Sequence, residues 1–251
     1  MSMFPISEIF SSLQGEGVNI GKPSIFVRFG TCNLSCGWSR VNGAWEKNGG
    51  WQCDAYYSWM DAKDFKLMEV FEVVSRIKEL GLGLKIKHLI FTGGEPLLQQ
   101  NRIRQILYAL EVSMRLTDYD HVKVEVETNG TILPEQSTWS RIKYWDISPK
   151  LSNSGMPEER RIVPNVIKFF RSFKDAYFKF VISSAEDVLE MQRTFVIPFD
   201  LSPNRIILMP EGTDVQTLNE RGVWLSKICL DNGYLFSPRL QIWLYGNKRG
   251  T

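Results

Sequence analysis

Residues 88–96 have the sequence HLIFTGGEP, and this stretch decides the class of fold that we predict. The apolar run 88–92 is typical of a short buried strand, and Gly93 and Gly94 end it. Paired glycines let backbone groups approach a ligand closely, and the carboxylate of Glu95 can engage an ammonium group. A strand-ending turn before a helix that starts at Pro96 explains the same residues equally well.

Strands and helices alternate on both sides of this stretch. Helical spacing of apolar residues predicts a helix over 67–80, and capping-box spacing starts further helices at Ser184 and Thr213. The remaining expected elements are a helix at 102–114 and strands at 25–29, 122–126, 144–147, 178–182, 205–209 and 240–245. This order predicts an α/β fold with a mostly parallel sheet, in which ligands bind at the carboxyl ends of the strands. Residues 43–51 (GAWEKNGGW) interrupt the order as an inserted loop or hairpin.

Composition restricts the function classes. The 251 residues are 43% hydrophobic and 23% charged, which is typical of a soluble globular protein. Thirty Lys and Arg against 28 Asp and Glu leave a net charge of +2, so bulk charge predicts neither nucleic-acid nor membrane binding. No apolar run reaches the roughly 18 residues of a membrane span, and residues 1–13 lack a signal-peptide pattern, so we expect a cytoplasmic protein.

Three of the four cysteines, Cys32, Cys36 and Cys53, lie in one short stretch directly after the first expected strand. Three thiolates can hold three irons of a cubane cluster and leave the fourth iron open. A structural zinc site is the alternative, and it normally needs a fourth protein ligand. Spacing alone leaves both open. Cys229 lies among apolar residues of the last expected helix, where we expect it to pack in the core.

A set of motifs over nearly the whole chain carries a family resemblance. The motifs are 8–10 (EIF), 13–17 (LQGEG), 26–28 (FVR), the cysteines, 53–59 (CDAYYSW), 92–96 (TGGEP), 127–131 (ETNGT), 148–150 (SPK) and 245–250 (YGNKRG). The cysteines followed by GGEP resemble the radical S-adenosylmethionine (SAM) superfamily. Together with QGEG, they resemble the 7-carboxy-7-deazaguanine synthase family within it. The resemblance implies one domain over 1–251, folded as an incomplete (β/α) barrel of roughly β6/α3 form.

Two departures from the family pattern matter. The usual C-x3-C-x2-C spacing would place the third cysteine at position 39, which is Ser39, and the C-D-x-x-Y-S-W signature begins only at Cys53. We therefore interpret residues 37–52 as an insertion and Cys53 as the third ligand. Ala55 stands where many members carry a hydroxyl that resembles a magnesium ligand, and a methyl group cannot supply it. The resemblance therefore implies Mg²⁺ as a possible cofactor, and Ala55 argues against a requirement for it.

The resemblance also implies the reaction and the residues that serve it. A [4Fe–4S] cluster and SAM would generate a radical that starts the contraction of 6-carboxy-5,6,7,8-tetrahydropterin to 7-carboxy-7-deazaguanine, with loss of ammonia, in queuosine and deazapurine biosynthesis. The implied cluster ligands are Cys32, Cys36 and Cys53; the SAM site is Gln52, Asp54, Gly93, Gly94, Glu95, Ser148, Pro149, Lys150 and Lys179; the substrate site is Leu13, Gln14, Gly15, Glu16, Arg28 and Thr92.

The chemistry of three substrate residues suits a small anionic heterocycle. Gln14 offers an amide donor and acceptor, Glu16 accepts from amino-pyrimidine N–H groups, and Arg28 pairs bidentately with a carboxylate. Without the resemblance, QGEG is a polar turn and Arg28 is a surface residue on an edge strand. A glycyl-radical activating enzyme, which would not need these groups, is one alternative function. A zinc-stabilised, non-catalytic binding protein is the other, and Ser39 and Ala55 are its main support.

Partners are implied mainly by the resemblance, which suggests a homodimer and a flavodoxin or ferredoxin as electron donor. Lys248 and Arg249 can attract such an acidic protein, or they can form a solvated basic tail. Trp38, Trp45, Trp51 and Trp59 surround the cluster loop, where they can exclude water, attach the insertion to the domain or form a dimer contact.

Overall fold

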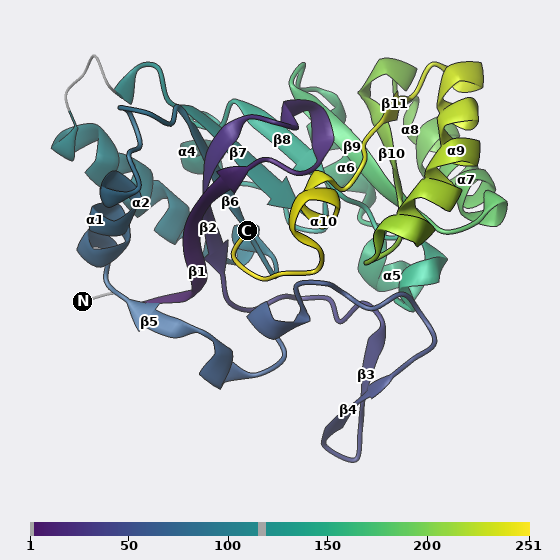
Figure 1. The fold of residues 1–251 in the computed structure, drawn as a ribbon, viewed down its shortest axis with the longest axis horizontal. Helices are drawn as coiled ribbons and strands as arrows, with labels where there is room; N and C mark the ends of the chain where they lie inside the picture. Colours follow the sequence, from purple (N-terminus) through teal and green to yellow (C-terminus); the bar gives the residue numbers. More distant parts are fainter. Residues whose placement is uncertain (1–2, 115–118) are drawn as a thin grey trace.

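The computed structural model describes residues 3–114 and 119–251, so the first two residues of the N-terminal segment considered above lie outside the described part. Its centre is a sheet of nine strands in the order β11-β10-β9-β8-β7-β6-β2-β1-β5 (Figure 1). The strands are β1 (Phe4–Leu13), β2 (Pro23–Phe29), β5 (Lys66–Met68), β6 (His88–Gly93), β7 (Lys123–Thr128), β8 (Tyr144–Ile147), β9 (Ala176–Ile182), β10 (Ile206–Pro210) and β11 (Leu235–Phe236).

Strands β2 and β6 to β11 are parallel to one another, whereas β1 pairs antiparallel with both β2 and β5. Strands β5 and β11 are the sheet's two edges, so among the described strands the sheet is open. The predicted α/β class and mostly parallel sheet are confirmed.

Helices connect the parallel strands. They are α1 (Val70–Glu79), α2 (Gln100–Ser113), α4 (Gln136–Trp139), α5 (Glu158–Arg161), α6 (Pro164–Arg171), α7 (Ala185–Met191), α8 (Ile197–Phe199), α9 (Val215–Asn232) and α10 (Leu240–Tyr245). Short 3₁₀ turns lie at Gly17–Asn19, Tyr56–Ser58, Ala62–Asp64, Pro96–Gln99, Ser152–Ser154 and Pro203–Arg205, and a π turn at Gln192–Val196. No helix in the described ranges has the length and apolar character that crossing a membrane requires.

Three sequence predictions about elements are wrong. Residues 240–245 form helix α10 and not a strand, because a short apolar run does not by itself distinguish the two, and Ile242 is the one residue of the run that is buried. Leu67 lies in β5, so the helix expected at 67–80 begins at Val70. Helix α9 is capped by Asp214, which accepts from the backbone N–H of Thr217, and not by Thr213. The capping box of Ser184 and Asp187 is confirmed.

The inserted segment is a hairpin of β3 (Trp38–Val41) and β4 (Ala44–Lys47) that projects from the body of the molecule (Figure 1). Asn42 and Gly43 both have positive φ, 48° and 86°, as a two-residue hairpin turn requires. Its aromatic side chains contact the body: Trp45 packs edge-on against Trp59 with ring centroids 5.3 Å apart. Of the roles considered for these tryptophans, the contacts favour attachment of the insertion to the domain.

Candidate active site

The three clustered cysteines come together although the hairpin separates them in sequence. Cys32 and Cys36 lie on the loop after β2, and the backbone N–H of Cys53 donates to the carbonyl oxygen of Cys36 at 3.2 Å. All three line a cavity of about 470 Å³. Ser39 instead pairs with Glu46 inside the hairpin and does not line this cavity. The chain path therefore returns Cys53 to the other two cysteines.

Cys36 is buried, and Cys32 and Cys53 are partly buried. Among the described residues, Glu125, Glu127 and Asp146 are the one group of potential metal ligands whose atoms all lie within 4.8 Å. Tetrahedral zinc, with bonds of about 2.3 Å, would hold sulfur atoms roughly 3.8 Å apart. The three cysteine Sγ atoms do not all lie within 4.8 Å of one another, so the structure does not gather them at the spacing of a single zinc ion. Burial raises the pKa of all three thiols, that of Cys53 to about 12, so a bound cation is needed to keep them as thiolates.

Gly93 and Gly94 line the same cavity and pack against the cysteine loop. The N–H of Gly94 donates to the carbonyl oxygen of Phe29 at 3.3 Å. A Cβ at position 94 would collide with the carbonyl oxygen of Thr31 and lie 2.9 Å from Cβ of Cys32. Glycine is therefore required here by the close approach of two backbones.

Glu95 has a different place from its glycine neighbours. Its buried carboxylate accepts hydrogen bonds from the N–H of Leu97 (2.9 Å), the hydroxyl of Thr128 (2.8 Å) and the N–H of Asn129 (2.7 Å). Burial raises the pKa of this carboxyl group. The side chain thus joins the ends of β6 and β7. Glu95 and Pro149 are the two expected site residues that do not line the cavity.

Five adjacent parallel strands contribute charged or hydroxyl side chains to the cavity, among them Arg28 (β2), Thr92 (β6), Glu127 (β7), Asp146 (β8) and Lys179 (β9). Arg28 is in register with Thr92, and Glu127 with Asp146, so each pair projects from the same face of the sheet. The sheet therefore aligns these groups in a row near its carboxyl edge.

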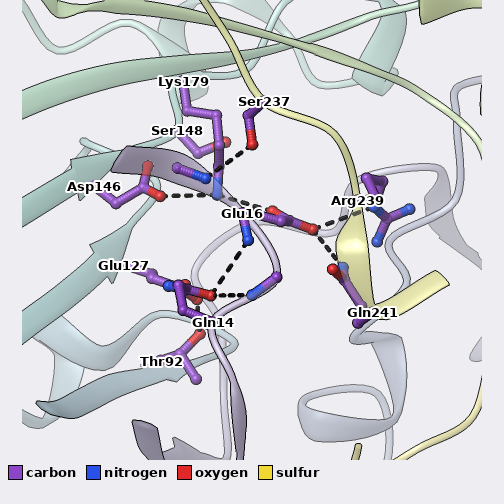
Figure 2. A network of polar contacts seen from close by, with 12 residues as sticks. Gln14, Glu16, Thr92, Glu127, Asp146, Ser148, Lys179, Ser237, Arg239 and Gln241 are labelled. Atoms are coloured by element: carbon purple, nitrogen blue, oxygen red, sulfur yellow. Dashed lines mark hydrogen bonds and ion pairs between the residues drawn. The ribbon is translucent and has the colours of Figure 1, made fainter. Parts of the chain in front are cut away.

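Gln14 contacts the middle of this row, at Glu127 (Figure 2). Its Nε2 donates to Oε1 of Glu125 and to Oε1 of Glu127, both at 2.9 Å, and its Oε1 accepts from the backbone N–H of Gly15 at 2.8 Å. Both amide hydrogens of Gln14 are used, so Gln14 positions Glu127. The other oxygen of Glu127 accepts from the hydroxyl of Thr92 at 2.7 Å. Each oxygen of Glu127 keeps a lone pair for a ligand.

Lys179 lies between two carboxylates at the β9 end of the row (Figure 2). Its Nζ is 2.8 Å from Oε2 of Glu16 and 2.9 Å from Oδ2 of Asp146. Burial disfavours the charged form of Glu16, but Lys179 and Arg239 outweigh it and lower the pKa of Glu16 well below 4.5. For Asp146, burial raises the pKa to about 7 despite Lys179, with nearby Glu127 acting in the same direction.

Segments from the C-terminal end complete the cavity. Arg239 donates from Nε to Oε1 of Glu16 at 3.2 Å, and Gln241 donates to the same oxygen at 2.7 Å (Figure 2). The N–H of Leu240 donates to the carbonyl oxygen of Gly15 at 2.9 Å, which places α10 against the QGEG loop. Figure 1 shows α10 in front of the strands.

Arg28 belongs to a second polar group at the cavity wall. Its Nε donates to Oε2 of Glu8 at 3.2 Å, and the Tyr57 hydroxyl donates to the same oxygen at 3.4 Å. Arg249 donates to the other oxygen of Glu8 at 2.5 Å, and its guanidinium carbon lies 3.8 Å from the centroid of the Tyr57 ring. The terminal nitrogens of Arg28 make no hydrogen bond with the described residues, so its fork remains available.

All other expected site residues line the cavity, namely Leu13, Gln14, Gly15, Glu16, Arg28, Cys32, Cys36, Gln52, Cys53, Asp54, Thr92, Gly93, Gly94, Ser148, Lys150 and Lys179. Sequence reasoning missed Glu127, Asp146, Arg239 and Gln241, which line it too. A signal existed for two of them: Glu127 opens the motif 127–131 (ETNGT), and Asp146 is the one charged residue of β8. Gln241 lies in the segment 240–245, which the sequence predicts as a strand, and Arg239 directly precedes that segment.

An open-sided trio of thiols at the carboxyl ends of parallel strands, beside a polar cavity, is the arrangement of a radical SAM enzyme. No protein-family model matches the chain. The 7-carboxy-7-deazaguanine synthase of Pyrobaculum aerophilum is 35% identical over 250 residues, which cover 98% of this chain and 96% of that protein. The synthase of Rhodopirellula baltica is 30% identical over 259 residues, covering 98% and 88%. The chain belongs to the 7-carboxy-7-deazaguanine synthase family.

The fold agrees with this assignment. The crystal structure of QueE from Escherichia coli superimposes with a TM-score of 0.61 at 20% identity, covering 95% of this chain and 94% of that one. At this identity, the likeness supports the fold and not the details of the site.

Proposed function

We propose that this chain converts 6-carboxy-5,6,7,8-tetrahydropterin to 7-carboxy-7-deazaguanine and ammonia. It would act in the cytoplasm, in deazapurine biosynthesis, and its sheet would curve as in an incomplete (β/α) barrel. The observation that carries the proposal is that Arg28, Thr92 and Glu127 line the same cavity as the three cysteine thiols. A cavity of about 470 Å³ suits a small heterocycle beside a cofactor. The polar row supports such a substrate over a glycyl radical in a protein chain.

Cys32, Cys36 and Cys53 would hold the [4Fe–4S] cluster, and backbone at Gly93 and Gly94 with the side chains of Ser148 and Lys150 would receive SAM. When bound, these cofactors supply the radical chemistry that removes a hydrogen atom from the substrate. The indole N–H of Trp59 lies 3.5 Å from Sγ of Cys53 and the N–H of Leu34 lies 3.4 Å from Sγ of Cys32, so both are placed to stabilise a thiolate.

The polar row would hold the substrate. The free fork of Arg28 matches the carboxylate in geometry and charge. Glu127, which Gln14 and Thr92 hold in place, would accept from N–H groups of the amino-pyrimidine edge. Glu16 was expected to take that role, but Lys179, Arg239 and Gln241 already donate to its two oxygens. We therefore assign Glu16 to positioning Lys179 and Arg239.

Magnesium does not fit the residues present. Ala55 offers no side-chain oxygen, and Oδ2 of the neighbouring Asp54 accepts from Arg239. The Glu125, Glu127 and Asp146 group already accepts from Asn19, Gln14, Thr92 and Lys179. We propose a reaction without Mg²⁺.

We also propose that a flavodoxin or ferredoxin supplies the electron and that the chain acts as a homodimer. Arg249, one of the two basic residues considered for the donor, pairs with Glu8 of its own chain, which leaves Lys248 for that contact. Light scattering after size-exclusion chromatography tests the dimer, and reduction by each donor class tests the electron source.

The deciding experiment is turnover by protein reconstituted without oxygen. Reduced enzyme with SAM should convert the carboxylated tetrahydropterin to the deazapurine, which mass spectrometry detects, and should release one equivalent of ammonia. The Cys53→Ala protein is the control for product that forms without the cluster site. If the cluster is loaded and its low-temperature EPR signal changes on SAM addition, but no deazapurine forms, the assignment of this pterin as the substrate is refuted. Tight binding of one zinc ion, with no cluster formed, would refute the proposal that the protein acts as this enzyme.

A further inference from the structure

Arg239 joins three segments that are far apart in sequence. Its Nε donates to Oε1 of Glu16 at 3.2 Å, Nη1 donates to the carbonyl oxygen of Gly212 at 2.6 Å, and Nη2 pairs with Oδ2 of Asp54 (Figure 2 shows the contact with Glu16). The side chain is only 7% exposed, yet it lines the cavity. A buried guanidinium therefore lies next to Asp54, the residue that follows the third cysteine.

The charge of this group is permanent. A guanidinium stays protonated in proteins, and it carries five N–H donors in a planar fork. Three of the five are used by Glu16, Gly212 and Asp54. In the described part of the chain the other two have no partner, so they are available to an oxygen of a molecule bound in the cavity.

The position of Arg239 matters because Asp54 and Ala55 lie beside it. Residue 55 is alanine, so the hydroxyl that would complete an oxygen site for a divalent cation is missing. The carboxylate of Asp54 is neutralised by Arg239 instead. A second cation at this place would have to displace the guanidinium or lie against it, and two positive charges in contact repel.

We propose that the guanidinium of Arg239 is a built-in cation that replaces a divalent metal ion in this chain. It contacts an oxygen of the substrate, and turnover needs no added Mg²⁺. The proposal rests on the proposed function for the identity of the substrate, but the absence of a divalent site at Asp54 can be measured without turnover.

Mn²⁺ titration followed by EPR gives the readout that is independent of activity. Wild-type protein should remove no free Mn²⁺ from solution up to about 1 mM, the weak end of oxygen-ligated sites. The double variant Arg239→Gln/Ala55→Thr, which restores a hydroxyl and frees Asp54, should bind one equivalent. Binding of one Mn²⁺ by wild type that Asp54→Asn abolishes would overturn the proposal, whatever the substrate is.

Kinetics separate contact with the substrate from a structural role. Arg239→Gln should lower kcat/KM by about 10- to 100-fold through loss of a charge-assisted contact, mainly in KM. Arg239→Lys should recover part of the loss, and Mg²⁺ should stimulate the Arg239→Gln/Ala55→Thr protein but not wild type. Arg205→Gln is the matched control, because Arg205 also donates to backbone carbonyl oxygens but does not line the cavity.

The outcomes are distinguishable. Tenfold stimulation of chelator-treated wild type by Mg²⁺ overturns the proposal, as does an Arg239→Gln protein with wild-type KM and kcat. If no variant turns over the pterin at all, the proposed function fails, and the Mn²⁺ titration alone then decides whether Arg239 excludes a divalent cation. Thermal unfolding of each variant checks that it is folded.

Discussion

The backbone N–H of Cys53 donates to the carbonyl oxygen of Cys36 at 3.2 Å, although sixteen residues lie between them. A second backbone bond, from Asn48 to Gly37 at 3.1 Å, closes the base of the same loop. Gly37 has a φ of 78°, and a Cβ there would collide with the backbone of Trp51 and Gln52. The two ends of the insertion, at Gly37 and Gln52, thus lie side by side next to the cysteine loop.

This closure predicts which side chain is the third ligand. Cys53→Ala should lose the cluster on anaerobic reconstitution, because only two thiols then remain in the cavity, whereas Ser39→Ala should keep the iron content of wild type. Iron and sulfide analysis with the visible spectrum measures both. The reverse pattern would mean that the hairpin, and not Cys53, supplies the ligand.

The close approach of Gly94 to the cysteine loop predicts a steric effect. Gly94→Ala should lower the free energy of unfolding by about 1–3 kcal/mol, because the new Cβ meets backbone at Thr31 that cannot move without shifting Cys32. Gly222→Ala in helix α9 is the matched control: its nearest neighbour, Cζ of Phe236, is 3.5 Å away, and alanine should stabilise the helix by about 0.5–1 kcal/mol. Urea unfolding compares the two. Equal effects would show that the packing at Gly94 is looser than described.

Much of the sheet could be predicted because parallel strands are buried on both faces, so each is a short apolar run that a glycine or a proline ends. The hairpin was predictable too, since Asn42 and Gly43 are turn residues and the cysteine signature resumes at Cys53. Helix α10 was not, because six residues with apolar majority fit either element and its position depends on contacts with Gly15 and Arg239.

The same limit applies to the site. Motif positions found the cysteines and three residues of the polar row, Arg28, Thr92 and Lys179, but they missed Glu127 and Asp146. The roles of Gln14 and Glu16 depend on their partners. Gln14 uses both amide hydrogens on Glu125 and Glu127, and Glu16 is surrounded by donors from β9 and the segment at Arg239. Those partners are distant in sequence, so only the folded arrangement distinguishes a residue that positions from one that binds.

The ion pairs of Glu16 predict a specific pH dependence of stability. Its folded pKa is lowered well below 4.5 by Lys179 and Arg239. A lowered carboxyl pKa stabilises the folded state above the unfolded pKa, and this contribution is lost as pH falls below about 4.5. Glu16→Gln should have a lower free energy of unfolding than wild type at pH 7. When the pH falls from about 5 to about 3, the free energy of unfolding of wild type should drop by about 2 kcal/mol more than that of Glu16→Gln. Chemical denaturation across this range measures it, with Glu46→Gln on the hairpin as the control for loss of one negative charge. Parallel curves for wild type and Glu16→Gln would contradict the ion-pair geometry.

The free fork of Arg28 predicts how the substrate carboxylate is bound. Arg28→Ala should lower kcat/KM by about 10- to 100-fold, since a bidentate charged contact is lost, while iron content and SAM binding stay at wild-type levels. Glu8 keeps Tyr57 and Arg249 as partners, so the variant leaves no unpaired buried carboxylate. Arg28→Lys retains the charge but not the fork, and its activity should be intermediate. Arg40→Ala, on the exposed hairpin, controls for the loss of one positive charge. Steady-state kinetics with the carboxylated pterin decides the matter. Turnover by Arg28→Ala equal to that of wild type would remove Arg28 from the substrate site and leave the carboxylate to another cation that lines the cavity, such as Arg249 or Arg239.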